Sequence, residues 1–130
     1  MVVELEQQRI LVIEDEERIA NLLQRQLELA GFEVRTADRG STALNAVEAQ
    51  RPDLIILDLR LPDMSGYELC WTLRRLYDHA QLPIVILTGV EQCMADLRRE
   101  ALGADAYLRK PYDVGELLQT IRHLLKSTDT

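Results

Sequence analysis

Short runs of aliphatic residues mark the predicted strands of this chain. Runs without polar alternation are typical of strands that are covered on both faces, and therefore of a parallel sheet. One further segment alternates polar and apolar residues, which predicts a more exposed strand at the edge of the sheet. The four aliphatic runs are 10–13, 54–57, 84–87 and the weaker 106–108, and the alternating segment is 32–37.

Helical patterns lie between these strands. In the first, apolar residues recur on one face from Ile19 to Ala30, and the following Gly31 is the residue favoured just past a helix end. In the last, Asp113 and Glu116 resemble a capping box, in which the first side chain bonds to a backbone N–H three residues on. The five expected helices lie at about 19–30, 41–50, 65–77, 92–102 and from 113 onward.

Five strands that alternate with five helices predict a doubly wound α/β fold. Parallel strands require right-handed crossovers, so the helices should cover both faces of the sheet. The joints are short, and no linker, repeat or low-complexity stretch is visible. We therefore expect one domain over residues 1–130, with its core at about 9–126 and flexible ends at 1–8 and 127–130.

Composition narrows the class of protein. A length of 130 residues suits a single domain, and 47% hydrophobic residues are too many for a disordered chain. No apolar run approaches the roughly 18 residues of a membrane-spanning helix. The first eight residues hold two acids and no Lys or Arg, unlike an export signal. The expected location is therefore the cytoplasm, with no membrane contact.

The net charge and the cysteine spacing argue against nucleic acid as a partner and against a cysteine metal or redox site. The 15 basic and 22 acidic residues give a net charge of 15 − 22 = −7, which argues against direct nucleic-acid binding by this domain. The adjacent basic residues Arg74 and Arg75 are expected on a solvated helix face. Cys70 and Cys93 lack the CxxC spacing of metal or redox sites and are expected to be reduced.

Polar residues follow the predicted strands at their carboxyl ends, where an open α/β sheet binds its ligands. Glu14 and Asp15 follow the first strand. Asp58, Thr88 and Lys110 follow the third, fourth and fifth strands. Each alone has an ordinary explanation, such as an acid at a helix start or an Asp that opens a loop. Lys110 is less ordinary, because the chain has only one other lysine. Their coincidence at one edge predicts a functional site.

The chemistry of these side chains favours a magnesium site that accepts a phosphoryl group. Carboxylates packed together repel one another unless a cation lies among them. Oxygen ligands without a nearby His or Cys are typical of a hard cation, and Mg²⁺ suits a site with few carboxylates that also receives phosphate oxygens. One carboxylate can then attack phosphorus and form an acyl phosphate, while Lys110 and Thr88 bind the oxygens of that group.

With this site, the sequence resembles the receiver domain of two-component response regulators over about residues 9–126. All the motifs that carry the resemblance occur in the order and at the spacing of that family, which makes the resemblance specific. They are 10–16, 54–66, 87–89 and 103–112. The resemblance implies a flavodoxin-like, CheY-like fold with strand order 2-1-3-4-5.

The same resemblance implies a role for each site residue. Asp58 would accept the phosphoryl group from a sensor histidine kinase or a histidine phosphotransfer protein. Lys110 would bind that group beside a Lys110–Pro111 peptide that is cis in the family. Thr88 and Tyr107 resemble the switch pair, which converts phosphorylation into a changed surface for a downstream protein or effector domain. The implied Mg²⁺ ligands are Glu14, Asp15, Asp58 and the backbone carbonyl of Arg60.

Several alternatives remain open from the residues alone. The domain could be the receiver portion of a longer DNA-binding transcriptional regulator. It could also dimerise on phosphorylation, although Ala106 replaces an acid that is common in that branch. A degenerate receiver that ignores phosphate is disfavoured by the complete set of acids, Thr88 and Lys110.

Two alternatives come from other classes of protein. A small phosphatase of the haloacid-dehalogenase type also uses Asp, Thr, Lys and Mg²⁺, but it needs a second Asp where this chain has Arg60. Flavin binding needs a Ser-, Thr- or Gly-rich loop where this chain has the acidic residues 14–17. We therefore expect a module that catalyses only its own phosphorylation and dephosphorylation, not an enzyme for a diffusible substrate.

Overall fold

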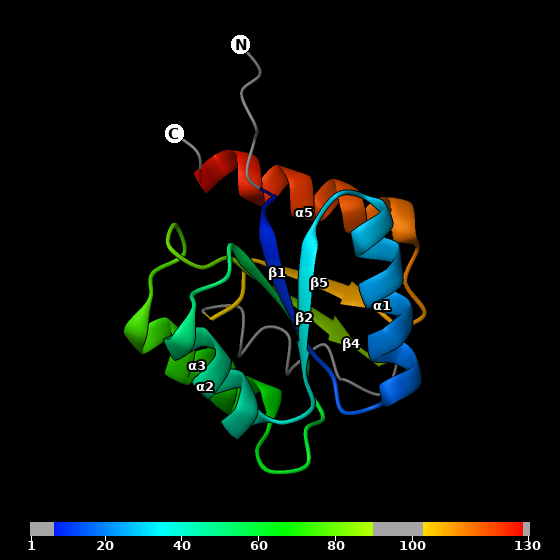
Figure 1. Ribbon diagram of the computed structural model, residues 1–130. Coiled ribbons are helices and arrows are strands. Elements are labelled where there is room, and N and C mark those ends of the chain that lie inside the picture. Colours follow the sequence, from blue (N-terminus) through cyan, green and yellow to red (C-terminus); the bar gives the residue numbers. More distant parts are fainter. Residues whose placement is uncertain (1–6, 90–102, 129–130) are drawn as a thin grey trace.

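The computed structural model describes residues 7–89 and 103–128 and shows a five-stranded parallel sheet with helices on both sides (Figure 1). The strands are β1 (Arg9–Ile13), β2 (Glu33–Ala37), β3 (Leu54–Asp58), β4 (Ile84–Thr88) and β5 (Ala106–Arg109). Their order across the sheet is β2-β1-β3-β4-β5. The doubly wound fold and the expected strand order are therefore confirmed.

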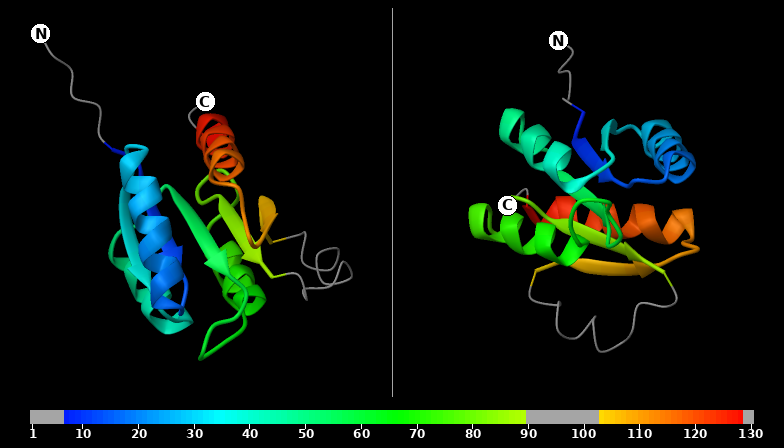
Figure 2. Two further views of the ribbon diagram at one scale, coloured as in Figure 1. Left: turned by 90° about the vertical axis from the view of Figure 1, so that its right-hand side faces the viewer. Right: turned by 90° about the horizontal axis from the view of Figure 1, so that it is seen from below.

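The described helices form two layers, one on each face of the sheet. α1 (Glu17–Leu29) and α5 (Val114–Thr128) lie on one face, and α2 (Gly40–Ala49) and α3 (Gly66–Leu76) lie on the other (Figure 2). The helix expected at 92–102, which includes Cys93, lies outside the described residues. Among the described helices, none has both the length and the apolar character needed to cross a membrane.

The central strands are buried on both faces, as their unbroken aliphatic runs predicted. Residues 10–13, 54–58 and 84–87 are all buried, whereas most of the edge strand β2 is exposed. Each layer of helices supplies large apolar side chains to its own side of the sheet. On one side these include Leu23, Leu27, Leu117 and Ile121, and on the other Val47, Leu69, Cys70 and Leu73.

Local chemistry sets several helix ends. Gly31 has φ of +102°, a conformation that costs glycine little, and it ends α1 where the sequence predicted. At the start of α3, the Ser65 hydroxyl accepts a hydrogen bond from the Glu68 N–H at 3.1 Å. At the start of α5, the Asp113 carboxylate accepts one from the Glu116 N–H at 3.0 Å, as predicted. These bonds satisfy backbone donors that have no partner inside the helix.

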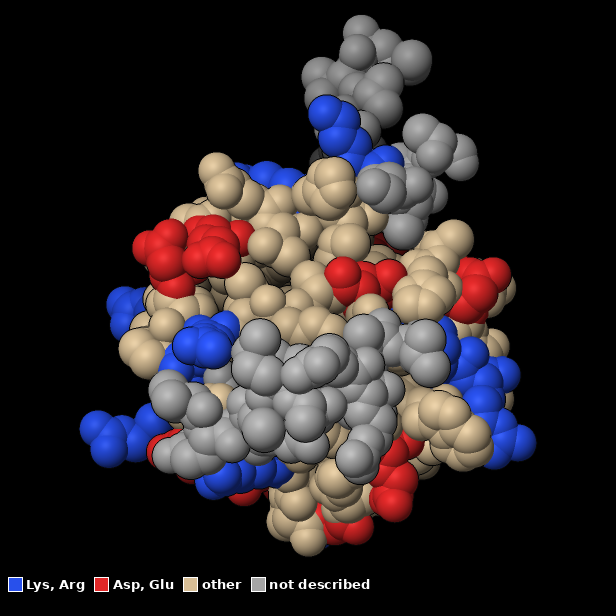
Figure 3. Space-filling model, turned by 180° about the vertical axis from the view of Figure 1, so that it is seen from behind, with Lys and Arg blue, Asp and Glu red and all other residues tan. Residues whose placement is uncertain are grey.

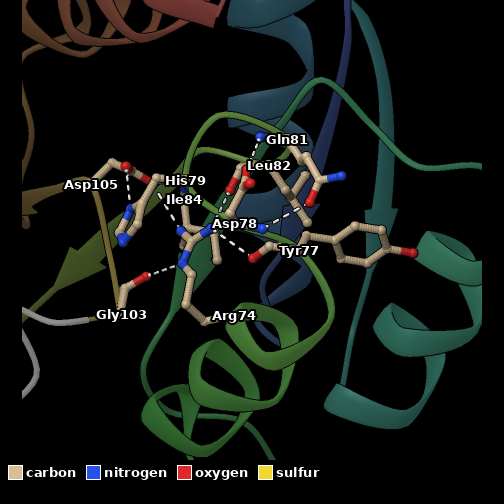
Figure 4. Close-up of polar contacts among 9 residues, drawn as sticks. All are labelled: Arg74, Tyr77, Asp78, His79, Gln81, Leu82, Ile84, Gly103 and Asp105. Carbon is tan, nitrogen blue, oxygen red and sulfur yellow. Dashed lines mark hydrogen bonds and ion pairs between the residues drawn. The ribbon is translucent and has the colours of Figure 1, made fainter.

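Arg74 anchors α3 to the amino ends of β4 and β5, so the expectation of a solvated side chain is wrong for this residue. Its Nε donates to the Gly103 carbonyl at 2.8 Å, and one Nη donates to the Leu82 carbonyl at 2.8 Å (Figure 4). The other Nη pairs with the Asp105 carboxylate at 3.0 Å, and the Arg74 side chain is only 12% exposed. The guanidinium is drawn inward because these acceptors lie beside the end of α3.

Candidate functional site

The carboxyl ends of the strands bring the predicted acidic residues to one edge of the sheet. Asp58 is the last residue of β3, and Glu14 and Asp15 directly follow β1, its neighbour in the sheet. Glu14 and Asp58 are buried, whereas Asp15 is exposed. In the described part of the chain, these are the only buried polar or charged residues, so burial of charge is confined to this edge.

The three carboxylates are close enough to share one cation. Glu14, Asp15 and Asp58 each offer an oxygen atom, and these atoms all lie within 4.8 Å of one another. A set of oxygen donors without a thiolate or imidazole suits a hard divalent cation. Mg²⁺ fits because it keeps several waters and needs only one or two protein carboxylates. The arrangement is therefore typical of a magnesium site.

Lys110 lies between two of these acids. Its Nζ is 2.9 Å from Oε1 of Glu14 and 3.3 Å from Oδ1 of Asp58. Lys110 follows directly after β5, and its peptide bond to Pro111 is cis, as the resemblance implied. The compact ammonium group of Lys110 therefore faces Asp58, the carboxylate predicted from the sequence to accept the phosphoryl group.

The pKa values in this cluster reflect burial and crowding. Burial and a hydrogen bond shared with Asp58 raise the pKa of Glu14 from 4.5 to about 7, although Lys110 acts in the opposite direction. Burial alone would lower the pKa of Lys110, but its hydrogen bond to Glu14 and the nearby negative charges raise it overall. The ammonium group of Lys110 therefore stays charged beside the acidic cluster.

The raised pKa of Glu14 predicts a pH-dependent stability in metal-free protein. The unfolded chain loses the Glu14 proton near pH 4.5, whereas the folded protein keeps it until about pH 7. Since the folded state binds the proton more tightly, the free energy of unfolding should fall as the pH rises through this window. Urea unfolding in EDTA at several pH values measures the slope, and Glu14→Gln should flatten it. A slope unchanged in that variant would contradict the assignment to Glu14.

The loop after β3 folds back on the strand end. The Gly66 N–H donates to the Leu59 carbonyl at 2.7 Å, and Arg60 and Ser65 form an isolated antiparallel bridge. A Cβ atom at Gly66 would lie 2.6 Å from the Asp58 carbonyl oxygen, so this close return requires glycine. The loop therefore holds the backbone of Arg60 beside Asp58, the predicted phosphoryl acceptor.

The other two predicted site residues lie on the neighbouring strands. Thr88 is the last residue of β4 and pairs with Arg109, the residue before Lys110. Tyr107 lies on β5, is half-buried, and packs against the core on the side of α2 and α3. Thr88 is thus placed at the carboxyl edge, whereas Tyr107 pairs with Ile86, two residues before Thr88, and their roles as a switch pair remain a prediction.

Sequence reasoning missed two contacts around the site. The Tyr112 hydroxyl donates to Oε1 of Gln26 at 2.7 Å, which joins the loop after β5 to α1. Asp63, in the loop after β3, accepts hydrogen bonds from backbone N–H groups at the start of α2. Neither contact has a local signal, because each joins residues far apart in the sequence.

Comparison with known proteins assigns the family. Residues 10–122 match the response regulator receiver domain. The chain belongs to this family. The receiver domain assignment confirms the resemblance drawn from the four motifs and accounts for the acidic magnesium-type site. It also makes this a domain whose chemistry is its own phosphorylation, so the phosphatase and flavin alternatives are set aside.

Curated relatives of this receiver domain include transcriptional regulators. It is 40% identical over 121 residues to the DNA-binding dual master transcriptional regulator RpaA of Synechocystis sp.. This match covers 93% of this chain and 50% of RpaA. It is 42% identical over 118 residues to the phosphate regulon transcriptional regulatory protein PhoB of Rhizobium meliloti, covering 91% of this chain and 52% of PhoB. The chain thus spans about half the length of the curated relatives it matches.

Solved structures agree with this assignment. A CheY-like receiver domain protein from Methanospirillum hungatei has a TM-score of 0.88 and 29% identity, covering 95% of this chain and 98% of that one. The response regulator TrrA of Thermotoga maritima, solved in complex with Mg²⁺-BeF, has a TM-score of 0.81 and 33% identity. That match covers 90% of this chain and 98% of TrrA.

Proposed function

We propose that Asp58 accepts a phosphoryl group from a phosphohistidine of a sensor histidine kinase or histidine phosphotransfer protein. A carboxylate oxygen of Asp58 attacks the phosphorus, the P–N bond breaks, and its electron pair stays on the imidazole nitrogen. The observation that carries this proposal is the position of Lys110, whose Nζ lies 3.3 Å from Asp58 at the edge of the acidic cluster. There it can bind the incoming oxygens.

The same residues would hold the metal. Glu14, Asp15, Asp58 and the backbone carbonyl of Arg60 would bind Mg²⁺, which supplies positive charge against the developing negative charge of the phosphoryl group. The oxygen-only donor set supports this choice. TrrA, whose structure holds Mg²⁺-BeF, is a related receiver protein.

The surface beside the site supports a protein as phosphodonor. An open hollow next to Lys110 is lined by apolar and amphipathic side chains from α1 and from the loop after β5. They include Ile19, Leu22, Pro111 and Tyr112. Leu22 of α1 is 50% exposed, so its aliphatic side chain is open to solvent in this hollow. A protein that brings a phosphohistidine to Asp58 could cover this hollow.

Thr88 and Tyr107 would convert phosphorylation into a new surface. A phosphoryl group adds charge and acceptor oxygens, which draw a nearby hydroxyl toward it. We propose that Thr88 makes this contact and that Tyr107 moves behind it. The half-buried position of Tyr107 on the edge strand β5 leaves its ring next to solvent and to the core, which supports such a movement.

The downstream partner is proposed from the relatives. RpaA and PhoB are transcriptional regulators of which this chain spans about half, so the domain would act as the receiver part of a DNA-binding regulator. On the face in Figure 3, basic side chains are interspersed with acidic ones among the described residues. With the net charge of −7, this supports a protein or effector domain, rather than DNA, as the direct target of this domain.

Labelling with a small phosphodonor tests the proposed function. Wild-type protein incubated with acetyl phosphate should gain a phosphoryl group in Mg²⁺ and none in EDTA. Borohydride reduction, followed by peptide mapping, locates an acyl phosphate by the residue that it reduces. We expect reduction at Asp58 alone. Labelling that ignores Mg²⁺, or that maps to another acid, would reject the proposal.

A further inference from the structure

The tip of the loop after β3 is tied to the start of α2 by one carboxylate. Oδ1 of Asp63 accepts the Gly40 N–H at 2.7 Å, and Oδ2 accepts the Ser41 N–H at 2.9 Å. Arg39, the N-cap residue of α2, provides no capping side chain of its own. A residue from another loop therefore caps this helix. The two bonds lower the pKa of Asp63, which keeps its carboxylate charged.

A side-chain contact strengthens the same attachment. A Cβ atom placed on Gly40 would lie only 2.5 Å from Sδ of Met64, so the Met64 side chain occupies the space above this glycine. Gly40 is buried. The loop tip is thus attached to α2 by two charge-assisted hydrogen bonds and by one close packing contact.

The base of this loop is fixed as well. Leu59 and Gly66 are joined by a 2.7 Å backbone hydrogen bond, and Arg60 pairs with Ser65 across the loop. Arg60 therefore lies between an anchored base and an anchored tip. Its carbonyl is the one proposed metal ligand supplied by the loop. Because Mg²⁺ demands near-ideal octahedral geometry, a small displacement of this carbonyl should weaken binding.

We propose that Asp63 is a positioning residue for the metal site: its bonds to Gly40 and Ser41 hold loop 59–66 against α2, and this places the Arg60 carbonyl for Mg²⁺. This inference rests on the proposed function, and Asp63 itself touches neither the metal nor the reacting atoms. Outer contacts that orient a ligand commonly matter for metal affinity by about 10-fold or more.

Three variants separate positioning from charge and from helix capping. Asp63→Ala removes both hydrogen bonds and the charge. Asp63→Asn removes the charge but keeps an amide oxygen that still accepts one N–H. Asp53→Ala is the matched control: Asp53 accepts the Arg9 N–H at 2.7 Å at the amino end of the sheet, opposite to the site. Asp53→Ala therefore loses one negative charge, as Asp63→Ala does, and a similar hydrogen bond to a backbone N–H.

Calorimetric titration with Mg²⁺ alone, paired with urea unfolding, gives the decisive comparison. We expect Asp63→Ala to bind Mg²⁺ about 10-fold more weakly than wild type, Asp63→Asn to be intermediate, and Asp53→Ala to be unchanged despite a comparable loss of stability. Should Asp63→Ala prove too unstable to titrate, the comparison of Asp63→Asn with Asp53→Asn, which loses the same charge at the opposite end of the sheet, decides the question: weaker Mg²⁺ binding in Asp63→Asn alone supports the proposal, and equal affinities overturn it.

The outcomes that overturn this inference are distinct from failure of the proposed function. If a folded Asp63→Ala protein binds Mg²⁺ as tightly as the wild type, Asp63 only caps α2 and does not position the metal site. Equal weakening in the Asn and Ala variants would assign the effect to charge instead of position. Absence of Mg²⁺ binding by the wild type would overturn the proposed function itself, whatever the variants do.

Discussion

Asp58→Asn should lose all labelling by acetyl phosphate, down to the level of a blank without protein. An amide has no anionic oxygen to attack phosphorus, so the variant cannot form the acyl phosphate. Glu14 is a poor substitute, because its side chain is only 2% exposed, against 11% for that of Asp58, and an attacking oxygen must reach the donor. Labelling is measured with radioactive donor in Mg²⁺ over the same time course as the wild type.

We expect the variant to stay folded, so unfolding should not account for the loss. Asp58 raises the pKa of Glu14 both by a hydrogen bond and by its charge, so its replacement with a neutral amide relieves repulsion in metal-free protein. We therefore expect Asp58→Asn to be at least as stable as the wild type in EDTA. Asp53→Asn, with the same chemical change at the opposite end of the sheet, should label normally. Labelling that survives Asp58→Asn would mean that another residue is the acceptor.

The sheet and its carboxyl edge could be predicted from the sequence because their signals are local. Each central strand is one aliphatic run, and such runs are typical of parallel strands that are buried on both faces. The functional side chains come directly after these runs, so Asp58 and Lys110 are placed by the topology alone. The acidic cluster follows from the rule that parallel strands end at one edge.

The contacts that hold this edge could not be predicted in the same way. Asp63 meets Gly40, and Arg74 meets Asp105, from positions 23 and 31 residues away. An Arg on a helix is usually solvated, so the residue type favours the wrong environment for Arg74. Asp63 is exposed as its type favours, but its partners on α2 lie far away in the sequence. Only folding brings Asp105 next to Arg74, so the sequence alone could not predict this contact, and the expectation of a solvated Arg74 was wrong.

Arg74→Met should be among the most destabilising single changes away from the site. The methionine keeps much of the apolar volume but donates no hydrogen bonds, so the Gly103 and Leu82 carbonyls and the Asp105 carboxylate each lose a donor. Asp105 is itself only 13% exposed. Leaving the acceptors of such a part-buried pair without this donor costs about 1–3 kcal/mol.

The carboxylate would not be left entirely without partners, which limits the loss. Asp105 still accepts the Ile84 N–H at 2.8 Å and contacts Nδ1 of His79 at 2.7 Å (Figure 4). Asp105→Asn added to Arg74→Met should therefore recover part of the stability, because it removes the unpaired charge. Such coupling between the two sites is what a double-mutant cycle measures.

Arg75→Met gives the matched control for Arg74→Met on the same helix. Arg75 is exposed and lies 5.0 Å from the centre of the Trp71 ring, so its loss should change the free energy of unfolding by about 0.5 kcal/mol or less. Urea unfolding of both variants, with m-values equal to that of the wild type, isolates the difference. Equal midpoints for the two variants would show that the Arg74 contacts contribute nothing, whereas a large gap assigns that stability to the bonds joining α3 to β4 and β5.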